Sequence, residues 1–580
     1  MFGARLRHTG LVSLRHLSFR FSRRFDMSTV RITRFGGIVP RYNAALVREN
    51  MASSAANVKL WHGTLAPFRL PAPVFDAPVE KARTIYRAGC CWLAFDDACI
   101  DVAEWLPTCE RVYLTGWKPY PVAAALPDTG CVFDWRRVGL PVPTAAPSAT
   151  ASDTSRPEYL TSSRSYVYTF VDSFGGEGAP SYPSDALLDV SETAGVTVTI
   201  PAPPLGGIWD IAAIRLYRVS EGFNDGTKPG APTTTAYLFV AEMPPVGQTF
   251  YDSLPADQLQ EANVSEQYTP PPDGLDGITQ LRDGVLAGFV GNQVWFCEPY
   301  EPQAWPVDYV LALDDRVRAM RWHDDVLYVM TDGHPYAIAE HCGDGTEPGK
   351  CCRKTYRFPK AAPIASRKSA AVTPRGVVYA SDAGLTLLSG RMLTTLTAPW
   401  YARDDWQALR PATMIGATVE GQYIGASCSS AFLFDLRDST ENDGISDNDL
   451  MPLTLSPNAL HTARDGKLYL AFGNVIHEWD AGADFLPYCW RSRLTVTPGL
   501  TNFAAARVVF DAYPWPMRAP RGVQVCHEAD GRRLIERPVN HSNPYRLPSG
   551  RLAHDHAITV TGVETVRELH IASSVTELGG

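Results

Sequence analysis

The sequence lacks most of the short motifs that mark common enzyme classes. It contains no G-x-x-x-x-G-K-[ST] phosphate loop and no G-x-G-x-x-G between a strand and a helix. The metalloprotease motif H-E-x-x-H and the nucleophile elbow G-x-S-x-G are missing as well. These absences count against NTPases, zinc proteases and α/β-hydrolases.

Long hydrophobic runs and long amphipathic helices are also scarce. No apolar run approaches the ~18 residues that a helix needs to cross a bilayer, so we expect no membrane-spanning segment. The clearest 3.6-residue period covers Pro40 to Asn57, where we expect a short N-terminal helix. The rest of the chain offers little that could form another.

Positive charge is concentrated at one end of the chain. The formal net charge is −9, but residues 1–26 hold six arginines and one aspartate, which leaves −14 for the remainder. An acidic body argues against a protein that wraps or reads DNA, because phosphate binding needs clustered Lys and Arg. An acidic body does suit a surface past which DNA slides without binding. We interpret residues 1–26 as a non-native or disordered extension ahead of Met27; a presequence and an ordered arm remain alternatives.

Glycine and proline are plentiful, and they separate short apolar alternations. The chain has 45 Gly and 46 Pro, and aromatic residues make up 11% of it. Two-residue alternation between Gly, Asp-Gly and Pro turns is typical of β-strands. The sequence therefore predicts an all-β protein.

One unit recurs along the chain: an apolar strand, a turn, an aromatic-rich strand, a second turn and another apolar strand. Units of this kind begin at Ile85, Val285, Val317, Ala370 and Leu460. Divergent antiparallel units at roughly 40–50 residues are typical of β-propeller blades, which bury their faces by stacking around an axis. We expect six to eight blades.

Residues 157–268 interrupt these units with strands whose spacing and alternation fit a β-sandwich of about 100 residues. Proline-rich stretches flank the segment at Pro141–Pro157 and at 270–272. It resembles a fibronectin type III-like module of the immunoglobulin-like class, inserted into the propeller. The expected organisation is an extension over 1–26, a docking segment and first blades over 27–156, the sandwich over 157–268, and further blades with C-terminal strands over 269–580.

Candidate chemical groups are few and isolated. Adjacent acidic pairs such as Asp324-Asp325 fit turns better than catalysis, since two acid/base carboxyls must face one substrate. Most of the twelve cysteines fit reduced core thiols; Cys342, Cys351 and Cys352 could instead bind metal or form a disulfide. His554 and His556 share one strand face without a visible third ligand. We expect no catalytic residue, no metal and no cofactor.

Two segments near the N-terminus carry a family resemblance. Phe35-Gly36-Gly37-Ile38-Val39-Pro40-Arg41 is followed by Asn57 to Arg69 with a Gly-x-Leu-x-Pro-x-Arg pattern. Together with 84–86, 92–95, 111–116 and 569–578, they resemble the tail nozzle (tail tubular protein B-like) virion proteins of short-tailed bacteriophages. The residues assigned to docking or ring packing are Phe35, Gly36, Gly37, Pro40, Arg41, Asn57, Trp61, Gly63, Pro67 and Arg69.

This resemblance implies a structural role in the virion tail after synthesis in the host bacterial cytoplasm. It implies a homo-hexameric ring below a head-to-tail adaptor, which would extend the channel for double-stranded DNA and hold tail fibres or spikes. The alternative is a β-propeller glycosidase or glycan-binding adhesin; an arginine cluster with Tyr and Glu inside one propeller mouth would favour it. A propeller scaffold with no viral link is a third possibility.

Overall fold

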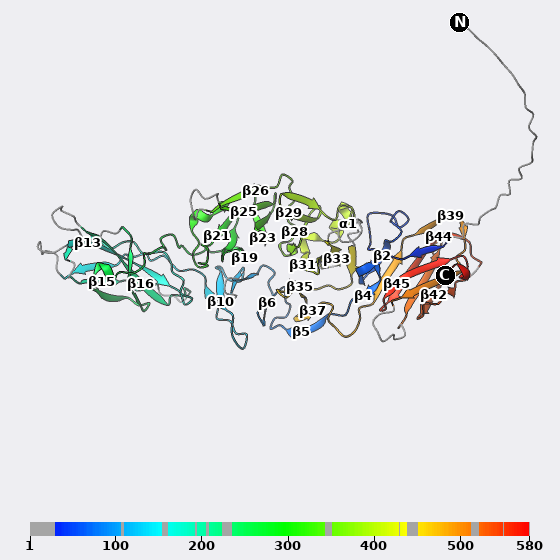
Figure 1. The fold of residues 1–580 in the computed structure, drawn as a ribbon, viewed down its shortest axis with the longest axis horizontal. Coiled ribbons are helices and arrows are strands. Elements are labelled where there is room, and N and C mark those ends of the chain that lie inside the picture. Colours follow the sequence, from blue (N-terminus) through cyan, green and yellow to red (C-terminus); the bar gives the residue numbers. More distant parts are fainter. Residues whose placement is uncertain are drawn as a thin grey trace, which may run out of the picture.

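Three β-rich parts follow one another along the length of the molecule (Figure 1). The computed structural model describes residues 29–105, 110–152, 161–191, 194–204, 208–222, 235–342, 351–428, 430–437, 450–511, 521–548 and 550–578. The extension proposed for residues 1–26 lies outside this part of the chain. A β-sandwich occupies one end, a propeller the middle, and a domain built from both ends of the chain the other end.

Seven small antiparallel sheets form the propeller in the described residues. The blades, in ring order, are β6 (Thr84–Ala88) and β7 (Cys91–Phe95); β8 (Asp101–Glu104), β9 (Arg111–Thr115), β10 (Val122–Ala125) and β11 (Arg136–Arg137); β19 (Asp276–Gln280), β20 (Leu286–Val290), β21 (Gln293–Phe296) and β22 (Leu311–Ala312); β23 (Val317–His323), β24 (Val326–Thr331), β25 (Tyr336–Cys342) and β26 (Cys351–Arg357); β27 (Ala371–Thr373), β28 (Gly376–Ser381), β29 (Gly384–Ser389) and β30 (Met392–Thr395); β31 (Ile415–Val419), β32 (Gln422–Ala426), β33 (Ala431–Asp435) and β34 (Leu450–Leu453); and β35 (Ala459–Thr462), β36 (Leu468–Phe472), β37 (Val475–Glu478) and β5 (Ala72–Asp76).

Two features of the structure close the ring of blades. The first strands of successive blades contact one another from β6 through β8, β19, β23, β27, β31 and β35 back to β6. The last blade takes its outer strand from the start of the chain, because β5 pairs with β37. This pairing ties the N-terminal side of the propeller to its last blade and removes an open edge. The predicted propeller is confirmed, with seven blades.

Acidic residues and Gly form the tight hairpin turns between the first two strands of several blades. Asp324 and Asp325 both take positive φ (50° and 61°) between β23 and β24, and Glu420-Gly421 does so between β31 and β32. A two-residue turn of this hand matches the twist of paired strands. The acidic pair Asp324-Asp325 is therefore a hairpin turn, as its sequence indicated.

The inserted part consists of two sheets that share one hydrophobic core. The sheets are β12 (Ser148–Ala151), β15 (Val196–Ile200) and β18 (Gln248–Asp252), and β14 (Leu187–Ser191), β13 (Thr161–Val171), β16 (Ala213–Gly222) and β17 (Leu238–Met243). Tyr166, Val198 and Leu216 are buried between them. The insertion falls between the second and third blades, and its strands begin at Ser148, ahead of the expected boundary at 157.

Both ends of the chain build the third part, which we call the terminal domain. One sheet contains β1 (Val30–Ile32), β45 (Val566–Ala572), β40 (Ala505–Phe510) and β43 (Tyr545–Arg546). The other contains β2 (Ala52–Ala56), β38 (Tyr488–Ser492), β44 (Ala553–Gly562), β41 (Val523–Ala529), β42 (Arg532–Val539) and β39 (Thr495–Thr501). The hairpin of β3 (Val58–Lys59) and β4 (Ala66–Pro67) lies beside them. Residues 30–67 thus belong here, whereas the sequence grouped them with the first blades.

The helix expected over Pro40–Asn57 is wrong. Residues 40–51 form turns, and Ala52–Ala56 pair as β2 with β38. The small residues that gave a loose helical period fit equally well in a strand, and the partner strand, far away in sequence, decides between the two. In the described residues the single α-helix is α1 (Arg403–Ala408), and no helix is long and apolar enough to span a membrane.

Candidate functional site

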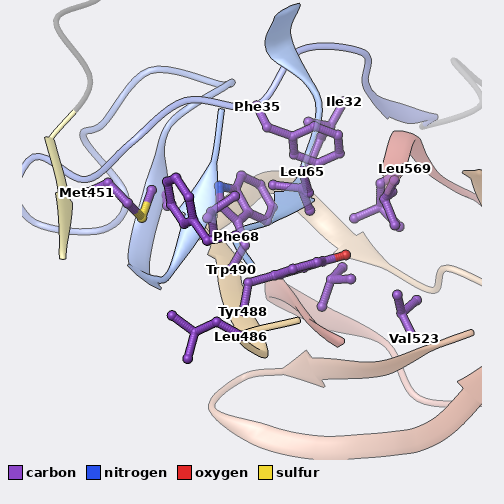
Figure 2. Close-up of a cluster of buried hydrophobic side chains, with 14 of the residues drawn as sticks. Ile32, Phe35, Leu65, Phe68, Met451, Leu486, Tyr488, Trp490, Val523 and Leu569 are labelled. Carbon is purple, nitrogen blue, oxygen red and sulfur yellow. The ribbon is translucent and has the colours of Figure 1, made fainter. Parts of the chain in front are cut away.

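The residues assigned to docking gather where the terminal domain meets the propeller. The Phe35 ring packs edge-on against Trp490, with ring centroids 4.9 Å apart, and the Trp490 indole N–H donates to the Gly36 carbonyl over 3.0 Å. Both side chains are almost fully buried. Figure 2 shows Phe35, Ile32 and Leu65 from the N-terminal segment beside Tyr488 and Trp490. We call this contact region the junction.

Gly37 and Asn57 connect the junction to the sixth blade. A Cβ at Gly37 would lie 2.5 Å from the Leu450 carbonyl oxygen, which accepts the N–H of Ile38. Asn57 is buried at a positive φ of 58° and donates its amide to the Thr454 hydroxyl and the Pro487 carbonyl. These positions therefore serve contacts within one chain.

The remaining docking candidates are more exposed. Gly63 takes a positive φ of 74°, and its carbonyl accepts the Phe35 N–H. Arg69 donates its backbone N–H to Asp480, and Arg41 donates to the Ala398 carbonyl. Pro67 pairs in the β3–β4 hairpin, Pro40 is exposed, and the Trp61 side chain lies outside the described residues. A role between subunits stays a prediction, and it is open chiefly to Pro40, Arg41 and Arg69.

A cavity of about 550 Å³ lies on the propeller axis. It is lined by inner-strand and turn residues: Arg83, Thr84, Ile85, Tyr86, Arg87, Ile100, Asp101, Val102, Ala103, Glu104, Ile278, Thr279, Gln280, Arg321, Lys368, Ile415, Gly416, Ala459, Leu460, His461, Thr462 and Arg464. We call it the axial cavity. Five cationic side chains face two carboxylates, so the cavity is positive inside a chain whose net charge is −9.

One part of the axial cavity is a cationic group around Asp101. Arg367, beside the cavity, pairs with Asp101, and Lys368 Nζ lies 3.7 Å from the same carboxylate. Burial alone would raise the pKa of Asp101, but Lys368, Arg367 and Arg321 outweigh it and lower that pKa. Burial lowers the pKa of Lys368. Asp101 is held ionised, which is unlike a general acid.

The wall formed by the last, first and second blades is aromatic and polar. The Tyr86 and His461 rings lie 4.7 Å apart, and His461 Nε2 accepts the backbone N–H of Arg87 over 3.2 Å. Burial lowers the pKa of His461 to about 4, so the ring is neutral at pH 7. Burial and then the Glu104 carboxylate raise the pKa of Tyr86. A raised pKa disfavours Tyr86 as a nucleophile.

No linear motif indicated the axial cavity. Asp101, Arg321 and Lys368 come from different blades, and each stands in an ordinary strand or turn sequence. The one usable signal is that Arg or Lys residues stand in or beside the first strands of several blades, as Arg87 does in β6 and Arg321 in β23. It becomes readable only once the inner strand of each blade is known.

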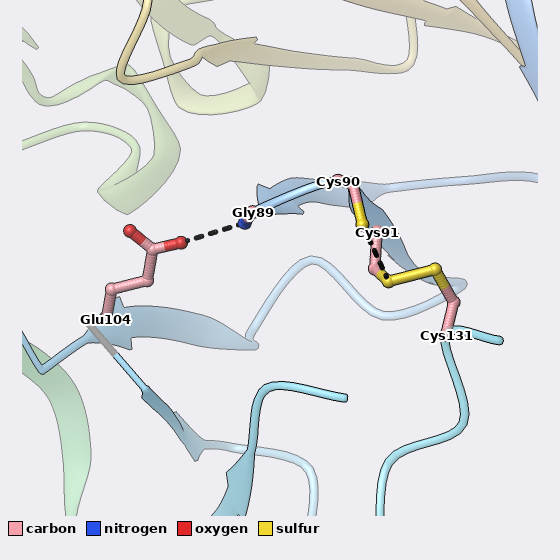
Figure 3. Close-up of a disulfide and its surroundings, with 5 residues drawn as sticks. All are labelled: Gly89, Cys90, Cys91, Glu104 and Cys131. Atoms are coloured by element: carbon pink, nitrogen blue, oxygen red, sulfur yellow. Dashed lines mark hydrogen bonds between the residues drawn. A yellow bond between two sulfur atoms is a disulfide. The ribbon is translucent and has the colours of Figure 1, made fainter. Parts of the chain in front are cut away.

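A disulfide joins the two-stranded first blade to the loop after β10. Cys91 at the start of β7 bonds to Cys131, and the exposed Cys90 sulfur lies 3.8 Å from that of Cys91 (Figure 3). The bond crosses a blade that has no third or fourth strand of its own. The expectation of reduced core thiols is therefore wrong for these two cysteines. The side chains of Cys342, Cys351 and Cys352 lie outside the described residues; their backbones pair in the β25–β26 hairpin.

We expect this disulfide to carry a measurable share of the propeller's stability. The bond closes a separation of 40 residues, for which chain entropy gives about 4 kcal/mol. Cys131→Ser should lower the free energy of unfolding by about 2–4 kcal/mol in urea denaturation without reductant. Cys99→Ser, at an exposed free cysteine, is the matched control. A wild-type midpoint that reductant leaves unchanged would contradict the prediction.

The strand face that suggested a metal site is a buried histidine pair instead. His556 packs against Phe503 and lies 5.7 Å from His527 between ring centroids, whereas His554 is exposed. Neither ring nitrogen of His527 has a hydrogen-bond partner in the described residues. Burial, and next the neighbouring His556, lower the pKa of His527 to about 4. The described chain brings no carboxylate or cysteine together with this pair as a metal cluster.

The His527 environment predicts acid sensitivity. Between pH ~6.5 and 4 the unfolded chain binds a proton at His527 that the folded chain does not bind. The stabilisation is complete above pH ~6.5 and is lost as the pH falls toward 4, so we expect a loss of about 2 kcal/mol by pH 5. His527→Leu should flatten the dependence of the urea midpoint on pH, and His554→Leu should not. If the urea midpoint changes with pH by the same amount in wild type and in His527→Leu, the prediction is wrong.

Comparisons with known proteins add little beyond the fold. No family model and no curated protein matches the chain. Similar solved structures include the CNH domain of AfRom2, at 9% identity and a TM-score of 0.25, over 56% of this chain and 89% of that one. The WD40 β-propeller domain of Doa1 matches at 10% and 0.22, over 50% and 90%. PorZ, a surface component of the type-IX secretion system of Porphyromonas gingivalis, matches at 12% and 0.22, over 83% and 76%. Because these TM-scores are low, the assignment of the fold as a propeller rests on the sheet order described above.

Proposed function

We propose that this chain is a structural subunit of a phage tail nozzle. In that role, about six copies would form a ring that extends the DNA channel below a head-to-tail adaptor and holds fibres or spikes. The inserted sandwich, which we propose to be fibronectin type III-like, would stand at the end of each subunit opposite to the terminal domain. The proposal requires no catalytic residue and no cofactor.

The observation that carries the proposal is the placement of the resemblance segments. Phe35–Arg41 and Asn57–Arg69 are separate in sequence, yet both bond to β34 of the sixth blade, at Leu450 and Pro452. Both also contact the chain at or just before β38, at Trp490 and Pro487. A shared pattern at these positions would therefore mark a shared way of joining the two chain ends to a propeller.

The charges support a channel between copies and not one through a single propeller. Inner-strand side chains line the axial cavity. Its positive charge would hold DNA phosphates in place. Outside residues 1–26 the chain carries −14, and an acidic channel wall would let DNA slide. DNA would pass through the centre of the ring of subunits.

Native mass spectrometry of the purified chain with its head-to-tail adaptor tests the proposal. We expect a ring of about six times the 63.6 kDa of one chain. Arg41→Glu and Arg69→Glu probe exposed docking candidates, and Arg532→Glu in the exposed start of β42 is the control. A chain that stays monomeric at all concentrations with the adaptor would oppose the proposal. Deleting residues 27–69 is unsuitable, because it removes β1 to β4.

One observation favours a second candidate, a propeller that binds or cleaves acidic glycans. Four arginines share the axial cavity with Tyr86 and Glu104, the combination expected for that alternative. The raised pKa of Tyr86 and the ionised Asp101 favour binding over cleavage. Release of free sugar from an acidic polysaccharide by the purified chain would support the enzymatic version; no release would exclude it.

A further inference from the structure

We propose that the axial cavity binds a small organic anion of about monosaccharide size through Arg321 and Lys368. The site is separate from the junction and does not depend on the proposed function, because a ring subunit and a soluble propeller would present the same cavity. Its volume of about 550 Å³ falls within the range of small-molecule pockets.

An excess of positive charge in the lining of the axial cavity is the first argument. Asp101 and Glu104 face Arg83, Arg87, Arg321, Lys368 and Arg464 across one cavity, a surplus of three positive charges. Arg87 also pairs with Asp465, outside the cavity, at 3.2 Å. Arg83 and Arg464 are exposed, whereas Arg321 and Lys368 are half-buried. Cations that converge on a partly buried space repel one another, and an anion bound among them reduces that repulsion.

The surroundings of Arg321 are the second argument. Its Nε donates to the Ala370 carbonyl over 3.1 Å and its Nη1 to the Met320 carbonyl over 2.7 Å. These bonds fix the guanidinium in place. Asp101 acts on it electrostatically, but none of the ion pairs among the described residues includes Arg321. A guanidinium that is held still without a directly paired carboxylate can bind a carboxylate or phosphate through two parallel N–H groups.

Lys368 lies within reach of the same space. Its side chain is 19% exposed, and its Nζ donates to the Ile100 carbonyl beside Asp101. Asp101 must balance Lys368 and also Arg367, to which it is paired directly; Arg367 has Asp276 as a second partner at 3.7 Å. Lys368 is therefore only partly neutralised, and it supplies a second positive group for the anion.

The cavity wall indicates an organic anion and not a bare inorganic one. Ile85, Val102, Ile278 and Leu460 line it together with the ring pair of Tyr86 and neutral His461. Apolar and aromatic groups contact the body of a ligand, while a few charged groups fix its orientation. A carboxylated sugar and a phosphorylated sugar share this chemistry.

Isothermal titration calorimetry on the full chain tests the site with three probes. N-acetylneuraminate carries a carboxylate, glucose 6-phosphate carries a phosphate, and N-acetylglucosamine is neutral. We expect one anionic probe or both to bind with a sub-millimolar Kd and the neutral sugar not to bind. Which anionic probe binds more tightly identifies the source of the negative charge. No binding of either at 10 mM (about −2.7 kcal/mol), or equal binding of the neutral sugar, would overturn the proposal.

Variants locate the binding in the cavity. Arg321→Met and Lys368→Met should each weaken the anionic probe at least about tenfold, the loss expected for one charge-assisted hydrogen bond. Arg532→Met, on the exposed surface of the terminal domain, should bind as wild type does. If Arg321→Met melts below wild type, Arg321→Lys replaces it, since it keeps the charge and loses the paired N–H geometry. Wild-type affinity in the folded Arg321 and Lys368 variants would overturn the assignment.

Discussion

Replacing Trp490 by alanine is expected to lower the free energy of unfolding by about 3–5 kcal/mol. Trp490 is fully buried, contacts Phe35 edge-on and donates its indole N–H to the Gly36 carbonyl. The substitution leaves a large cavity and removes the donor that holds the N-terminal segment. It should therefore release residues 30–68 as well as destabilise the terminal domain.

Urea denaturation together with limited proteolysis measures this effect. Cleavage in Trp490→Ala is expected first within residues 40–51, the turn segment between β1 and β2. Trp117→Ala is the matched control, because Trp117 is 38% exposed and should cost much less. A Trp490 variant that loses less than the Trp117 variant would contradict the junction as described.

Removing Asp252 is expected to cost about 3–5 kcal/mol and to unfold the sandwich before the propeller. Asp252 in β18 pairs with Arg218 in β16 at 2.7 Å, and both side chains are fully buried. Asp252 also accepts the hydroxyl proton of Tyr166 over 2.8 Å. The pair thus joins the two sheets, and Asp252→Ala would leave an uncompensated guanidinium between them.

A double variant separates the charge from the packing. Arg218→Met with Asp252→Leu should recover most of the loss, since a buried pair replaced by apolar side chains is often neutral or stabilising. Hydrogen exchange of peptides within 148–252 and within the blades reports each part by itself. A single Asp252→Ala variant that costs less than about 1 kcal/mol, or a double variant that is no better, would be inconsistent with this role.

The local features of the fold were accessible from the sequence. Alternating strands and Asp or Gly turns are local features, so the units that begin at Val285, Val317, Ala370 and Leu460 each fall within one blade. The unit that begins at Ile85 instead runs from the first blade into β8 of the second. The sandwich was recognisable from the spacing and alternation of its strands between two proline-rich stretches. Conformation that depends on neighbours in sequence is what periodicity can detect.

Structural features that depend on residues far apart in the sequence could not be predicted from the sequence. β1 pairs with β45 and β5 with β37, across most of the chain, and no local pattern records such pairs. The pairing of β2 with β38 is a further pairing of this kind, and it gives turns and a strand where the sequence predicted a helix over Pro40–Asn57. The axial cavity is a further case, because its charged residues meet only through the ring of blades.

Quantitative mass spectrometry of virus particles purified from the source, normalised to the major capsid protein, tests the proposal that this chain is a structural part of a virion tail. We expect about six copies per particle, with peptides from the junction and from the sandwich in equal amounts. Absence of the chain from purified particles would contradict the proposal.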